Sequence, residues 1–140
     1  MTLEKLDNLV KVNQLKVEPA DAKEFSGMLR AGDAKLKDSL ISGLSEDSQF
    51  SLAYAAAHAF SLAALRWYGY RSESRYLVFQ CLQHTLDMDK AKWRVLDKCH
   101  QARNLAEYEG HLDVNPRLLK ELISITKDIQ TLVKALPQIK

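Results

Sequence analysis

Apolar residues recur at helical spacing along nearly the whole chain, and this periodicity is the feature that most restricts the possible folds. The steps are three and four residues long, and no segment between turn signals shows the sustained alternation that is typical of a strand. Only five glycines and three prolines occur among 140 residues, and they fall where helices are expected to end or begin. The pattern therefore predicts an all-α fold.

Capping signals divide this periodic sequence into separate helices. Asp21 begins a pattern close to a capping box, Ser45 precedes two acidic residues, and Asn115 precedes a proline. Gly43 and Gly69 stand where helices end, because glycine adopts the left-handed conformation without steric cost. These signals predict helices over residues 2–16, 21–42, 46–68, 74–87, 88–110 and 116–136. In an alternative interpretation, the fourth and fifth are one bent helix.

Residues 46–68 are expected to form the central helix of a bundle, because two of their faces are apolar. Phe60 and Trp67 lie on one face and Phe50 and Tyr54 on the adjoining one, with alanines between them. The chain has the length of one ordinary domain. We therefore expect residues 1–140 to form a single up-and-down helical bundle of about five to six helices. The last helix carries an apolar seam: Leu118, Leu122, Ile125, Ile129, Leu132 and Leu136.

The composition is that of a soluble globular protein, with 46% hydrophobic and 27% charged residues. A net charge of +2 is too small to indicate nucleic-acid binding through bulk charge. The first ten residues contain Glu4, Lys5 and Asp7 in place of an apolar signal segment. The most apolar window, residues 52–65, is shorter than the roughly 20 residues of a membrane span. We expect a cytoplasmic protein without a membrane partner.

The cysteines and histidines do not have the spacing of a metal site. Cys81 and Cys99 are too few for a disulfide framework, and they are expected to be reduced and unbridged. His84 and His100 lie close to them in sequence, but the paired short-loop spacing of structural zinc sites is absent. The chain also lacks a nucleophile elbow and a glycine-rich phosphate loop. We therefore expect no metal and no cofactor.

Polar groups are concentrated in the stretch "HQARNLAEYEGH", which runs from His100 to His111. His100, Arg103 and Glu107 share a helix stripe with Trp93 and Leu96, and Asn104 lies beside them. An imidazole and a guanidinium on one face suit phosphate binding and acid–base chemistry. In the alternative, Arg103 and Glu107 are only an ion pair on a solvated helix face.

The stretch "RWYGYRSESRY", residues 66–76, alternates four aromatic residues with three arginines around a helix break. Such a segment offers stacking faces and phosphate contacts to single-stranded RNA, with Arg71 and Arg75 as the binding residues. In the alternative, its aromatic side chains pack on the bundle. His58, inside the alanine-rich helix, is expected to be a hydrogen-bonded core or interface residue.

Two segments resemble small bacterial HEPN-domain proteins. "ARNLAEYEG", residues 102–110, is similar to the signature in the late helix of that family, and "SQFSLAYAAAHAFSLAALRWYGYRS", residues 48–72, resembles its alanine-rich early helix. The helix pattern after residue 20 fits as well. The resemblance implies a bundle that is usually dimeric. In active members, an Arg and a His a few residues later meet in an interfacial cleft and cleave RNA without a metal.

Arg103 matches the family arginine and Asn104 the polar residue after it, whereas Tyr108 stands where active members have histidine. His100 precedes Arg103 by one turn, and His111 lies beyond Gly110. The resemblance thus implies a tentative catalytic set of Arg103, His100 and His111. The expected binding set is Arg103, Asn104, Glu107, Tyr108, Arg71 and Arg75.

The function implied by the resemblance is RNA or nucleotide binding within a bacterial toxin–antitoxin or defence system, with weak or absent RNase activity. The expected partners are a second copy of the chain, with the Arg103 face near the twofold axis, and a nucleotidyltransferase or antitoxin. The alternative is a non-catalytic helical module for protein–protein interaction.

Overall fold

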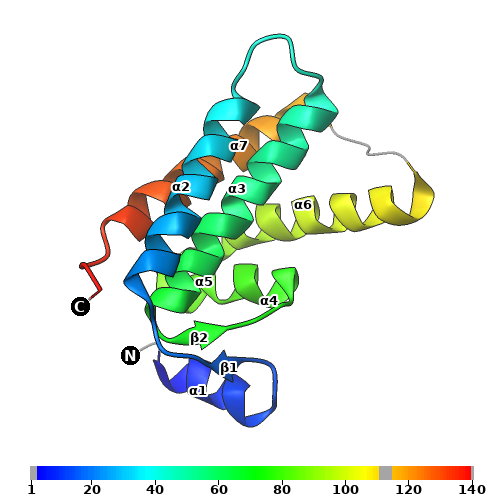
Figure 1. Cartoon of the computed structure of the whole chain (residues 1–140). Helices are drawn as coiled ribbons and strands as arrows, with labels where there is room; N and C mark the ends of the chain where they lie inside the picture. The colour runs from blue at the N-terminus through cyan, green and yellow to red at the C-terminus, as the bar shows by residue number, and fades with distance from the viewer. Residues whose placement is uncertain (1–2, 111–114, 140) are drawn as a thin grey trace.

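The computed structural model describes residues 3–110 and 115–139, without the side chains of residue 3 and residues 107–109. It confirms the all-α bundle, to which one very small sheet is added (Figure 1). The helices are α1 (Leu3–Lys11), α2 (Ala22–Ser39), α3 (Glu46–Trp67), α4 (Arg75–Gln80), α5 (Leu82–Thr85), α6 (Lys90–Glu109) and α7 (Pro116–Lys134). The strands are β1 (Lys16–Val17) and β2 (Tyr70–Arg71).

Helix α3 lies at the centre, as its two apolar faces predict. It forms an antiparallel hairpin with α2 and also packs against α7, α4 and α5 (Figure 1). Helix α6 crosses this hairpin, and its C-terminal end projects from the bundle (Figure 1). The buried side chains of α3 include small and aromatic residues: Phe50, Ala53, Tyr54, Ala56, Ala57, Phe60, Ala63 and Ala64. The alanines allow neighbouring helices to approach closely.

Two hydrophobic clusters hold the elements together. The larger cluster joins α2, α3, α6 and α7, and Cys99 lies in it. The smaller cluster packs α1 and the turn after it against the end of α3, β2 and α4. Its buried residues are Leu6, Leu15, Leu65, Tyr70, Val78 and Cys81. Both thiols are unbridged. Burial raises the pKa of Cys81 to about 11 and that of Cys99 to about 12, so both side chains behave as small hydrophobes.

The prediction of a first helix over residues 2–16 was wrong at its end. Helix α1 stops at Lys11, and the chain turns through Asn13, whose φ is 62°, into β1. Strand β1 pairs antiparallel with β2, with Val17 opposite Tyr70. Two causes oppose a longer helix: Pro19 disfavours helical backbone just before it, and burial of Leu15 in the smaller cluster fixes the turn.

The segment after β2 is two short helices and a break, which excludes one bent helix over residues 74–110. Asp87 has a φ of 52°, and Asp89 caps α6 by accepting a hydrogen bond from the Lys92 amide (2.9 Å). Two positions were assigned to the wrong face. Leu96 is fully buried instead of sharing the stripe of His100. In α7, Leu132 is 40% exposed, and the seam uses Leu119 and Val133.

No helix within the described ranges has both the length and the apolar character that crossing a bilayer requires.

A buried arginine clamps the segment before α2 to the end of α3. Arg66 is 2% exposed, and its Nε donates to Glu24 Oε1 (2.6 Å). Its terminal nitrogens donate to the backbone carbonyls of Glu18 and Pro19, both at 2.7 Å. Arg71 completes the clamp by ion pairs with Glu18 and Glu24. The hydrogen bond from Arg71 holds the pKa of Glu18 below its usual value, so the clamp weakens as pH falls through that lowered pKa.

The contact between α2 and α3 predicts opposite effects for two alanine substitutions in α2. A Cβ on Gly32 lies 2.6–2.8 Å from ring atoms of the fully buried Phe60, whereas the nearest atom to a Cβ on Gly27 is the Arg30 guanidinium at 3.9 Å. Gly32→Ala should lower the free energy of unfolding by about 1–3 kcal/mol through overpacking. Gly27→Ala should raise it by about 0.5–1 kcal/mol. Urea unfolding measures both, and a neutral Gly32→Ala would contradict the close contact.

The clamp predicts a large cost for removing its central cation. Arg66→Gln removes the donor to the buried carbonyl oxygen of Tyr70 and to the part-buried ones of Glu18 and Pro19, and one unsatisfied buried group costs about 1–3 kcal/mol. The exposed Arg30 on α2 is the control, and Arg30→Gln should change stability by no more than about 0.5 kcal/mol. Equal unfolding midpoints for the two variants would show that the clamp does not stabilise the fold.

Candidate functional site

A cleft of about 470 Å³ lies between α3, the segment at residues 71–75, and α6. It brings together the arginine-rich stretch and the polar stretch that the sequence identified separately. Its lining residues are His58, Leu62, Arg71, Ser72, Glu73, Arg75 and His100. The binding prediction for Arg71 and Arg75 and the prediction for His100 therefore concern one place in the molecule.

Local sequence signals fix the three walls of the cleft. Helix α3 supplies His58 one turn after Tyr54. After β2, Ser74 caps α4 by accepting a hydrogen bond from the Leu77 amide (3.3 Å), which puts Arg75 at the first position of that helix. Helix α6 supplies His100. The backbone of each wall is thus positioned by a helix that packs into the bundle or begins at the wall.

His58 is the most perturbed titratable group of the cleft. Burial, together with the positive charges of Arg75, Lys35 and Arg103, lowers the pKa of His58 to about 4. The three cations come from α4, α2 and α6, so positive charge surrounds this side chain from several elements. Its ring stands edge-on to Phe79 at 6.1 Å. No hydrogen bond holds it within the described ranges, in contrast to the expectation of a hydrogen-bonded histidine.

The two arginines of the lining have different surroundings. Arg71 is engaged by the carboxylates of Glu18 and Glu24, so its charge is already compensated. Arg75 is exposed and has no ion pair in the part of the chain that the structure describes. Glu73 is the acidic side chain of the lining. Arg75 is therefore the arginine of the lining that has no carboxylate partner among the described side chains.

His100 is held by hydrogen bonds at both ring nitrogens. Nδ1 lies 2.9 Å from the hydroxyl oxygen of Tyr54, and Nε2 lies 3.2 Å from the side-chain amide nitrogen of Asn104. The ring also stacks on Tyr54, with a centroid separation of 6.5 Å, and lies 6.1 Å from the ring of Tyr76. These contacts orient the imidazole and occupy both of its nitrogens.

Arg103 turns toward α3 instead of lining the cleft. Its guanidinium carbon lies 5.0 Å from the ring centroid of Tyr54, a cation–π contact of about 0.5–2 kcal/mol. The structure thus brings His100 and Arg103 to Tyr54, with Asn104 held on His100. His111 lies outside the described residues, as do the side chains of Glu107 and Tyr108, so the predictions for these three are not placed.

Sequence reasoning missed the part that His58 plays in the cleft. The available signal for a histidine at the edge of a site was its position one turn from Tyr54, in a part of the helix that is mostly apolar. The contribution of Lys35 has no comparable signal, because it depends on how α2 packs beside α3.

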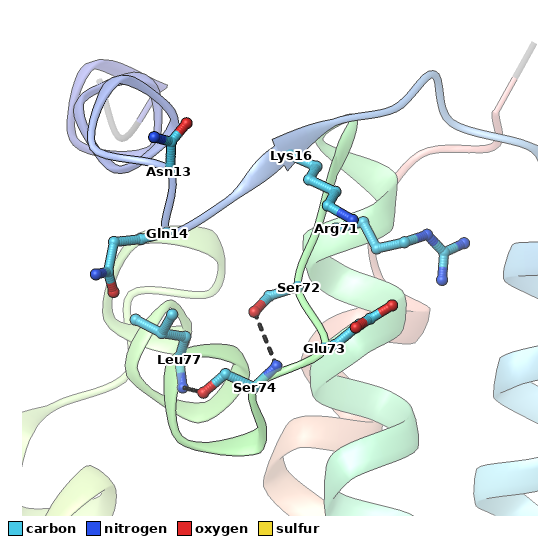
Figure 2. Close-up of a pocket in the computed structure, with 8 residues that line it drawn as sticks. All are labelled: Asn13, Gln14, Lys16, Arg71, Ser72, Glu73, Ser74 and Leu77. Atoms are coloured by element: carbon cyan, nitrogen blue, oxygen red, sulfur yellow. Dashed lines mark hydrogen bonds between the residues drawn. The ribbon is translucent and has the colours of Figure 1, made fainter.

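A second pocket, of about 300 Å³, adjoins the cleft on the other side of residues 71–73 (Figure 2). One wall of this pocket is the turn before β1 and the start of β1, with Asn13, Gln14 and Lys16. The opposite wall is the start of α4, with Ser74 and Leu77. Figure 2 shows Arg71 and Glu73 pointing away from this pocket. Among the residues described, no group of three or more His, Cys, Asp or Glu side chains gathers as a metal site would require.

The environment of His58 predicts its protonation state. An unperturbed histidine titrates near pH 6.5, whereas His58 in the folded chain has a pKa of about 4. Protonation therefore favours the unfolded chain, and stability should fall as pH drops from about 6.5 to about 4. His58→Gln should show a weaker dependence in the same range. Nitrogen NMR of the imidazole tests the assignment directly, and a ring that titrates near 6.5 would contradict it.

Comparisons of the chain with protein-family models, with curated proteins and with solved structures find no match.

Proposed function

We propose that this protein binds RNA or nucleotide phosphates in the cleft between α3, residues 71–75 and α6. The observation that carries the proposal is the exposed Arg75 in the cleft lining, whose charge acts on His58 together with that of Lys35 on α2. Arg75 presents a guanidinium without an ion pair among the described side chains, and a guanidinium binds phosphate through two parallel hydrogen bonds. A ligand phosphate supplies the compensating negative charge.

The small net charge of +2 is compatible with this proposal, because anion binding depends on the electrostatic potential within the cleft and not on the charge of the whole chain. A concave site with low-dielectric walls focuses the field of a few charges and raises the local concentration of anions. Arg66 and Arg71 have carboxylate partners, so we attribute the field in the cleft to Arg75 and Lys35, which both act on His58. Binding should therefore be moderate and sensitive to salt.

The arrangement supports binding more than cleavage. General acid–base catalysis needs a group with a pKa near the working pH and within reach of the transferred proton. His58 has a pKa of about 4, and His100 has both ring nitrogens engaged by Tyr54 and Asn104. Tyr108 stands at the position where active HEPN members have histidine. We therefore propose weak or absent RNase activity.

The resemblance to small HEPN-domain proteins extends the proposal to the cellular setting. It implies a component of a bacterial toxin–antitoxin or defence system that acts as a homodimer, with a nucleotidyltransferase or antitoxin as partner. These roles stay proposals. Addition of purified protein to total RNA without a metal tests the enzymatic part.

The alternative function, a helical module for protein–protein interaction, is favoured by the projecting end of α6. Leu105 is 54% exposed there, and Figure 1 shows this end of the helix extending beyond the bundle. A projecting helix end offers a surface that a partner helix can pack against, with Leu105 as its exposed apolar contact. Leu105→Glu should abolish such an interaction and leave RNA affinity unchanged.

The cleft proposal predicts that Arg75→Ala weakens RNA binding. Fluorescence anisotropy with a labelled single-stranded oligonucleotide of about eight nucleotides measures the affinity at several salt concentrations. The loss of one phosphate contact should reduce the slope of log K against log salt by about 0.7. Stability should change by no more than about 0.5 kcal/mol, because Arg75 is an exposed side chain.

The matched control is Arg117→Ala on α7, which removes the same charge from a side chain that is 91% exposed and does not line the cleft. It should bind RNA almost as the unchanged protein does. Equal affinities for the two variants would place any RNA contact outside the cleft.

A further inference from the structure

An aromatic row borders the cleft beside the candidate phosphate-binding arginine. His100 lies in the cleft lining, and its ring centroid is 6.1 Å from that of Tyr76. Tyr76 in turn lies 6.2 Å from Trp93, with an interplanar angle of 74°. Helix α4 supplies Tyr76, and α6 supplies Trp93 and His100. The row therefore leads from the cleft outward along the contact between these two helices.

The bundle does not use the outer two rings for its core. Tyr76 is 40% exposed and Trp93 is half-buried. Neither side chain packs against either hydrophobic cluster of the described chain. By contrast, Tyr68 packs against the smaller cluster, and the Trp67 indole donates a hydrogen bond to the Pro137 carbonyl (2.8 Å). Tyr76 and Trp93 are thus large aromatic surfaces whose position the fold alone does not explain.

We infer that Tyr76 and Trp93 form a stacking subsite for an unpaired base of a single-stranded RNA chain whose neighbouring phosphate lies on Arg75. This inference rests on the proposed function and extends it from phosphate binding to base recognition. Arg75 and His100 line the same cleft, and the ring of Tyr76 lies beside that of His100, so a phosphate on Arg75 and a base on the row lie at neighbouring places. Every base has a π-face, so such stacking tolerates different sequences.

The neighbouring guanidinium favours a nucleotide over other ligands that use aromatic rings. Cationic ligands such as quaternary ammonium groups bind in aromatic cages, but Arg75 in the adjoining cleft repels them. A ligand with both an anionic group and a flat aromatic group matches both features. A nucleotide unit of single-stranded RNA has these two groups next to each other.

Fluorescence separates the two tryptophans of the chain. In Trp67→Phe, Trp93 is the remaining tryptophan of the 140 residues, and in Trp93→Phe the remaining one is Trp67. Titration with a short single-stranded ribo-oligonucleotide should quench the emission of the first variant, because a stacked base lies on the indole. It should leave the emission of the second unchanged.

Affinity measurements test the energetic contribution of the row. Tyr76→Leu and Trp93→Leu should each weaken oligonucleotide binding about 5- to 150-fold, which corresponds to about 1–3 kcal/mol for one stacked base. Tyr76→Phe keeps the ring and should bind like the unchanged protein. An abasic oligonucleotide with the same number of phosphates should bind the unchanged protein and Tyr76→Leu equally, and more weakly than the RNA. A ribonucleoside monophosphate shows whether one unit is enough.

The outcomes distinguish this inference from the proposed function. If RNA binds and Arg75→Ala weakens it, but abasic chains bind equally well or Trp93 emission does not change, the stacking subsite is overturned and phosphate binding in the cleft remains. If neither RNA nor abasic chains bind the unchanged protein, the proposed function fails and the inference fails with it.

Discussion

The buried guanidinium of Arg66 is the interaction on which the arrangement of the N-terminal region depends. A charged group removed from water must be paired and hydrogen-bonded, or it strongly destabilises the fold. Arg66 satisfies this requirement with the Glu24 carboxylate and with the carbonyls of Glu18, Pro19 and Tyr70. These partners lie before α2 (Glu18 and Pro19), in its first turn (Glu24) and after α3 (Tyr70), so one side chain connects all three places. The pairing of β1 with β2 and the path into α4 follow from that.

The same constraint separates two arginines that look equivalent in the sequence. Arg71 belongs to the clamp, because Glu18 and Glu24 carry more negative charge than Arg66 alone balances. Arg75, four residues further along the chain, begins α4 and lines the cleft. The first arginine is engaged by carboxylates, and the second has no ion pair among the described side chains. An available guanidinium is thus presented in a chain whose overall charge is nearly balanced.

Local signals in the sequence were sufficient to predict most of the fold. The side chains of Asp21, Ser45 and Asn115 accept the capping hydrogen bonds that their positions predict, and α3 is buried on the faces that its apolar pattern indicates. The strand pairing was missed because two residues in each strand carry no periodicity, and their partner lies more than fifty residues away.

For the site, the sequence identified individual residues better than their arrangement. His100 and Arg75 were predicted separately, and their meeting with His58 depends on how α6 crosses α3 and α4. The direction of Arg103 toward Tyr54 also follows from this crossing. Helical spacing shows which residues share a face. It does not show which neighbouring helix that face meets, because the crossing geometry is set by packing between distant segments.

Tyr54 has a consequence for how such a protein can vary. Its ring is buried in the larger cluster, where it meets Phe79 edge-on, while its hydroxyl bonds His100 and its face receives Arg103. One side chain therefore belongs both to the packed interior and to the polar group at its edge. Phenylalanine at this position would keep the packing and the ring face under Arg103, and would lose the hydrogen bond to His100. The orientation of His100 thus depends on a single hydroxyl group of the core.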